Sequence, residues 1–135
     1  MPAQSYNLIF SNPPFFEQHL KSSDNKRNLA LHSEELKLDE LIASASRLLK
    51  PTGHFAVLLP YARTAKFIYL AGDHELFLHD AVSVKQTPAH QPFRSMLLFG
   101  KTRVSAPGST TITIKDGDEY TALFAMLLKD YYINL

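Results

Sequence analysis

The chain has 135 residues, 45% of them hydrophobic and 20% charged, which is typical of a globular protein and predicts a single domain, residues 1–135. Its 14 Lys and Arg nearly balance its 13 Asp and Glu, so its overall charge does not indicate nucleic-acid binding. The absence of cysteine excludes disulfides, thiolate zinc sites and cysteine nucleophiles. The sequence has neither a signal peptide nor an apolar run of about 18 residues, so we expect a cytoplasmic protein.

Two short apolar runs predict buried strands. Residues 6–10 (YNLIF) are followed by Ser11-Asn12-Pro13-Pro14, and residues 54–59 (HFAVLL) are followed by Pro60. Both runs are too short for helices, and proline ends each of them.

The segment between these strands predicts a loop and then a helix. Residues 18–28 are polar and partly basic, and we expect them to form a loop that carries Lys21, Lys26 and Arg27. Residues 34–50 predict a helix, because apolar residues recur at helical spacing and acidic residues gather near the start. Pro51 and Gly53 are expected to end this helix.

The second half of the chain predicts adjacent strands between two helices. Residues 61–70 are expected to form a helix, residues 75–85, 94–103 and 110–115 three strands, and the residues after Asp118 a final helix. A turn is expected at Asp116-Gly117. The predicted order is β-α-β-α-β-β-β-α, an α/β fold with parallel strands and an antiparallel edge hairpin.

The sequence Asn12-Pro13-Pro14-Phe15 directly follows a predicted buried strand, where open α/β sheets bind ligands. The two prolines hold the backbone extended and remove two N–H donors. The side-chain oxygen of Asn12 and the carbonyl of Pro13 remain as acceptors, with the flat ring of Phe15 beside them. Such a site suits a planar group that bears an amine. Two acceptors on its N–H bonds draw the nitrogen towards pyramidal geometry and expose its lone pair.

Ser11-Asn12-Pro13-Pro14-Phe15-Phe16 resembles the NPP(Y/F) motif of class I methyltransferases that methylate amino groups with S-adenosyl-L-methionine (SAM). Residues 6–10 resemble the fourth strand of that family, and residues 49–55 (LKPTGHF) resemble its entry into the fifth. More narrowly, residues 15–18, 27–32 and 120–123 and Tyr131-Tyr132 are similar to bacterial tRNA1(Val) adenine-N6-methyltransferases. The resemblance implies the C-terminal half of a Rossmann-like SAM methyltransferase sheet and methyl transfer to N6 of adenine in tRNA.

The resemblance also implies roles for individual residues. Asn12 and Pro13 would accept hydrogen bonds from the adenine amine, and Phe15 would stack on the base; these three are the expected catalytic residues. Asn12 and Pro14 are expected to contact SAM, the implied cofactor. The expected substrate-binding residues are Phe15, Phe16, Lys26, Arg27 and His32.

The glycines depart from the pattern of that family, which holds SAM on a glycine-rich loop after its first strand. The five glycines here are Gly53, Gly72, Gly100, Gly108 and Gly117, and the closest two are eight positions apart. We therefore expect the C-terminal part of a methyltransferase domain, lacking half of the cofactor site and inactive alone. Its exposed sheet edge is expected to form a homo-oligomer.

Two other readings stay open on the sequence. The chain could be a non-catalytic RNA-binding or dimerising half-domain, or an NPP(Y/F) enzyme acting on another amino group, in DNA adenine, rRNA guanine or protein glutamine. The six histidines form neither an i, i+4 pair nor an HxH motif, so no metal site is expected, nor any membrane association.

Overall fold

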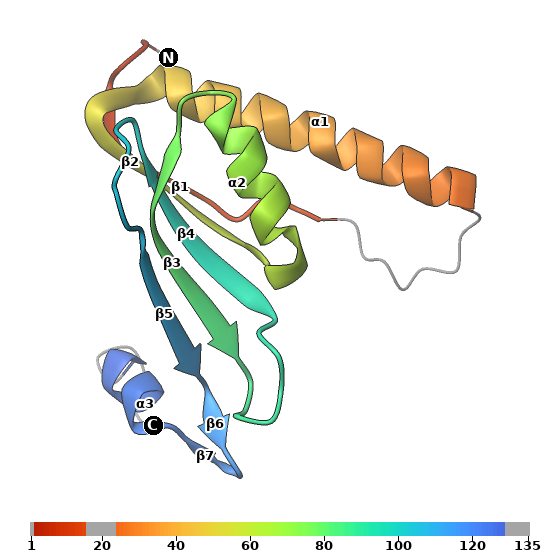
Figure 1. Ribbon diagram of the computed structural model, residues 1–135, viewed down its shortest axis with the longest axis vertical. Coiled ribbons are helices and arrows are strands. Elements are labelled where there is room, and N and C mark those ends of the chain that lie inside the picture. Colours follow the sequence, from red (N-terminus) through yellow and green to blue (C-terminus); the bar gives the residue numbers. More distant parts are fainter. Residues whose placement is uncertain (1, 16–23, 129–135) are drawn as a thin grey trace.

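The computed structural model describes residues 2–15 and 24–128. Figure 1 shows helices packed beside a sheet, with a short hairpin and a small helix at the far end of the strands. The elements are β1 (Tyr6–Ser11), α1 (Asp24–Leu48), β2 (Leu49–Pro60), η1 (Tyr61–Arg63), α2 (Thr64–Gly72), β3 (Phe77–Lys85), β4 (Arg94–Gly100), β5 (Gly108–Thr113), β6 (Lys115–Asp116), β7 (Glu119–Tyr120) and α3 (Ala122–Leu128). The predicted α/β class and order are confirmed, and the short elements η1, β6 and β7 add to them.

The five main strands form one mixed sheet in the order β1-β2-β4-β3-β5. β1 pairs with β2 and β3 pairs with β5 in parallel, whereas β4 runs antiparallel to both β2 and β3. β3 and β4 are the predicted antiparallel hairpin, and β5 extends the sheet beyond it. The two edge strands among the described residues are therefore β1 and β5.

One face of the sheet carries the core, because alternate side chains of each strand point to it. α1 and α2 pack on this face, and Phe55, Phe67 and Phe99 are fully buried there with ring centroids 5.7 to 6.2 Å apart. On the opposite face Leu8 and Phe10 remain 62% and 61% exposed. An apolar face that no described helix covers is thus left along β1 and its neighbours.

The start and end of α1 differ from the sequence prediction. The helix begins at Asp24, ten residues before the predicted start at Glu34, so Lys26 and Arg27 lie on a helix and not in a loop. The first turns of α1 bury few side chains, so they lack the regularly spaced apolar residues from which the helix was predicted. Their Lys, Arg, Leu and Ala residues nevertheless favour helix formation. β2 follows α1 immediately, so Pro51 and Gly53 lie inside that strand.

Pairing between β1 and β2 is irregular at their start. Tyr6 pairs with Leu49 and Leu8 with His54, so two steps along β1 correspond to five along β2. Gly53 lies in this excursion, and a Cβ there would stand 2.9 Å from the Tyr6 carbonyl oxygen and 2.7 Å from Leu49 Cδ1. Only glycine fits so close an approach of the two backbones. From Leu8 to Ser11 the register is regular.

The last helix begins later than predicted. α3 starts at Ala122 and not after Asp118, because residues up to Tyr120 form the β6–β7 hairpin. Gly117, in the turn of this hairpin, has a positive φ of 67° that favours glycine. The hydroxyl of Thr121 accepts the N–H of Phe124 at 3.2 Å and so caps the start of α3.

Candidate functional site

Asn12–Phe15 lie where the sequence predicts them, in irregular backbone at the carboxyl end of β1. Pro13 and Phe15 are half-buried, and Phe15 packs against the hydrophobic core, while Asn12 and Pro14 are exposed. β1 is an edge strand of the described sheet and none of its residues is buried, whereas the sequence predicted a buried strand. Phe16 lies outside the described residues.

A cavity of about 660 Å³ separates this segment from α1. Its volume falls within the range of about 300–1,000 Å³ typical of small-molecule sites, and its lining is largely apolar with a few polar side chains. The lining residues are Ser11, Asn12, Pro13, Pro14, Phe15, Ala30, Ser33, Glu34, Lys37, Leu38 and Leu41. The motif thus forms one wall of the cavity and α1 forms the other.

An ion pair fixes the α1 wall. Arg63 Nε donates to Glu34 Oε2 at 2.9 Å, and its Nη2 donates to Oε1 at 3.4 Å. The two side chains are only 12% and 10% exposed. Arg63 lies in η1, directly after the carboxyl end of β2, so the pair ties α1 to the end of the sheet where the motif lies. The sequence does not indicate this role, because the two residues are 29 positions apart and no local pattern joins them.

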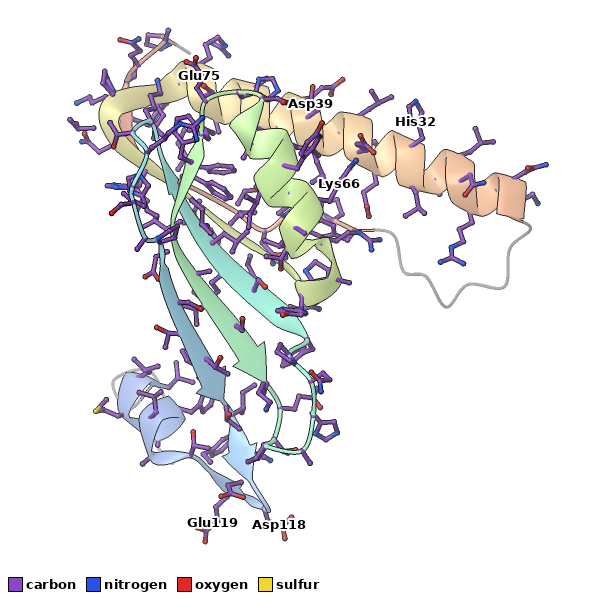
Figure 2. All side chains as sticks on the ribbon, in the orientation of Figure 1. His32, Asp39, Lys66, Glu75, Asp118 and Glu119 are labelled. Atoms are coloured by element: carbon purple, nitrogen blue, oxygen red, sulfur yellow. The ribbon has the colours of Figure 1, made fainter. Side chains whose placement is uncertain are left out.

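The predicted RNA-contacting residues lie on α1 but outside the cavity lining. Lys26, Arg27 and His32 are exposed, and Figure 2 shows His32 on the side of α1 turned away from α2. Lys37, which the sequence analysis did not single out, does line the cavity. The available signal was helical spacing, since Lys37 follows Lys26 by eleven residues and therefore lies on nearly the same face.

The geometry suits the binding of a flat heterocycle with an amine. The cavity lining includes an aromatic residue, Phe15, an amide residue, Asn12, and the two prolines between them, with Lys37 on the α1 side. Among residues 2–15 and 24–128, no three His, Asp or Glu side chains gather as metal ligands would. No helix in the same ranges is long and apolar enough to cross a membrane.

The sequence matches no protein-family model but has clear relatives. It is 32% identical over 134 residues to the tRNA1(Val) (adenine(37)-N6)-methyltransferase of Flavobacterium psychrophilum, covering 99% of this chain and 57% of the relative. The proteins of the same name from Flavobacterium johnsoniae and Parabacteroides distasonis are 35% identical over 135 residues and 34% identical over 131 residues. The chain therefore spans little more than half the length of these curated relatives.

Three solved structures with a similar fold are described as methyltransferases or methylases. A protein from Agrobacterium tumefaciens described as a predicted O-methyltransferase gives a TM-score of 0.63 at 13% identity, over 95% of this chain and 53% of its own. The cytosine-N4-specific PvuII DNA methyltransferase gives 0.58 at 17% identity, over 95% and 56%. A Thermus thermophilus protein described as a putative DNA modification methylase, solved with SAM bound, gives 0.57 at 14% identity, over 78% and 52%. The chain thus has part of a class I SAM methyltransferase fold and is similar, along nearly its whole length, to the tRNA1(Val) (adenine(37)-N6)-methyltransferases.

Proposed function

We propose that this chain is the C-terminal part of a SAM-dependent methyltransferase domain that methylates N6 of adenine in tRNA. One observation carries the proposal: the Asn-Pro-Pro-Phe segment ends β1 and forms the wall of a cavity of about 660 Å³. The names of the relatives support the substrate, and the chain covers 57% of their length, as a part of such an enzyme would.

In this proposal Asn12 and Pro13 act on the amine. The Asn12 side-chain oxygen and the Pro13 carbonyl accept its two N–H groups, and the nitrogen lone pair turns outwards for attack. Phe15, anchored against the core, stacks on the adenine, which contributes about 1–3 kcal/mol. Such acceptors stabilise the transition state more than the bound base, because the N–H groups grow more acidic as the nitrogen gains its methyl group.

The residues present fit only part of a SAM site. Asn12 and Pro14 are exposed beside the cavity and are the proposed contacts to the cofactor. The chain has no glycine-rich loop to hold the rest of it. SAM, when bound in the complete domain, supplies an activated methyl group, so these residues need only orient the amine.

The proposal extends to partners and location. Lys26, Arg27 and His32 are exposed on α1, and we assign them contacts with RNA. The apolar face around Leu8 and Phe10 and the unpaired edge of β1 would join two copies of the chain, because such surfaces rarely persist on monomers. An enzyme that modifies tRNA would act in the cytoplasm.

The test compares two RNA hairpins that differ by a single amine. One anticodon stem-loop carries adenine 3′ of the anticodon, and the other carries unsubstituted purine there. The 135-residue chain should bind the adenine hairpin about fivefold more tightly, the contribution of about one net hydrogen bond. Asn12→Ala should reduce this preference, because the Pro13 carbonyl remains as the second acceptor, and Phe15→Ala should weaken the binding of both hairpins. Asn28→Ala, on an exposed part of α1, should change the affinity for neither hairpin. Equal affinity of the wild-type chain for both hairpins would contradict the proposal and favour a non-catalytic RNA-binding module.

A further inference from the structure

The side of α1 that faces the cavity carries three cations. At about 100° of rotation per residue, the residues of α1 that line the cavity occupy an arc of roughly 140° of the helix surface. Lys37 is among them, and Lys26 and Arg27 fall inside the same arc one turn before Ala30, the first lining residue. Three exposed basic side chains therefore lead along the helix into the cavity.

The arc has a net positive charge, because few acidic side chains of α1 lie within it. Glu34 is the one acidic residue of α1 within it, and its carboxylate is ion-paired with Arg63. Glu40 lies just outside the arc, one turn beyond Lys37, and marks the end of the basic stretch. His32 lies outside this arc, on the side of α1 turned away from α2 (Figure 2).

We propose that the basic residues of this arc bind successive phosphates of an RNA strand and so form a phosphate track along α1. That the strand is RNA rests on the proposed function. Lys37 holds a phosphate next to the nucleotide whose base enters the cavity, and Lys26 and Arg27 hold phosphates of flanking nucleotides. Lys26 and Lys37 are about 16 Å apart along the helix axis, a span that a strand covers in a few nucleotides. Phosphate contacts fix the register of the strand, and the cavity then reads the base.

The test is charge reversal at two positions of the same helix. Lys37→Glu and Arg47→Glu each change the net charge by two, but Arg47 lies in the last turn of α1, outside the arc and about 15 Å further along the axis. Fluorescence anisotropy would follow a labelled anticodon stem-loop RNA, binding the 135-residue chain over a series of salt concentrations. Circular dichroism would confirm that both variants are folded.

We expect Lys37→Glu to weaken binding about five- to tenfold at low salt and to reduce the slope of log Kd against log salt by about 1. Arg47→Glu should stay within about twofold of wild type, and a Lys26→Glu, Arg27→Glu double variant should reproduce the loss. The loss should persist on a hairpin with an abasic site at the target position, because phosphates are read without the base.

Equal effects of Lys37→Glu and Arg47→Glu, or no RNA binding by the wild-type chain, would overturn the track. If the adenine preference depends on Asn12 while Lys37→Glu has no effect, the proposed function stands and the track fails. If Lys37→Glu weakens RNA binding but the chain shows no preference for adenine, the track stands and the proposed function fails.

Discussion

Glu34→Gln should be strongly destabilising, because it removes a charge from a carboxylate that Arg63 holds through two nitrogens. The variant turns a contact between two charged groups into a neutral one, in a site where the Arg63 side chain is only 12% exposed. A hydrogen bond to a charged group contributes about 1.5–3 kcal/mol. Since this contact is largely buried and uses two nitrogens of Arg63, we take the high end, about 3 kcal/mol. For a chain of this length, that lowers Tm by about 10 °C.

Glu35→Gln is the matched control. Glu35 pairs with Lys66 at 3.3 Å, but these side chains are 43% and 50% exposed, so its loss should cost less than about 1 kcal/mol. Urea denaturation followed by circular dichroism gives both values. A double-mutant cycle with Arg63→Met isolates the coupling between Glu34 and Arg63, which should exceed about 1 kcal/mol. If Glu34→Gln costs no more than Glu35→Gln, the ion pair does not hold α1 in place and our reasoning about the cavity wall fails.

Three further predictions concern the motif, the cofactor and the sheet edge. In the complete methyltransferase, Asn12→Ala should lower kcat far more than it weakens SAM binding; equal turnover of both enzymes on unmodified tRNA would remove Asn12 from the mechanism. The 135-residue chain alone should bind SAM weakly or not at all, so micromolar affinity in calorimetry would refute a site divided between this chain and other residues. Light scattering should find the chain self-associated at micromolar concentration, and a Leu8→Lys, Phe10→Lys variant should shift it towards the monomer mass; a wild-type monomer throughout would defeat this prediction.

Local patterns predicted the elements that bury apolar residues at regular spacing. In the run at residues 54–59, Phe55, Val57 and Leu59 are buried in the core on one face of the sheet. The run at residues 6–10 also forms a strand, but only Ile9 packs against the core, so the prediction of a buried strand was wrong there. The same logic failed for the first ten residues of α1, which extend past the core and have little to bury. Amphipathic spacing reports burial, so a solvated stretch of helix leaves no such signal.

The motif could be placed from the sequence, but the opposite wall of the cavity could not. Asn12–Phe15 follow a recognisable strand, so the carboxyl end of that strand locates them. Glu34 and Lys37 line the cavity because of the angle at which α1 crosses the sheet and the rotation of the helix about its own axis. That rotation depends on long-range packing and on contacts such as the one with Arg63, 29 residues away. Assigning Lys26 and Arg27 to a loop also hid their alignment with Lys37.

The irregular pairing near Gly53 separates a part of the β1–β2 pair that tolerates a change in length from a part that does not. Between Leu49 and His54, β2 has three more residues than the matching part of β1, and after it the pairing from Leu8 to Ser11 advances residue by residue. The number of residues between Leu49 and His54 can therefore change without altering which partner faces Ile9, Phe10 or Ser11. An insertion or deletion there would be absorbed before the strand reaches Asn12. We therefore expect homologues to vary in length at this junction while Asn12–Phe15 keep their position at the cavity.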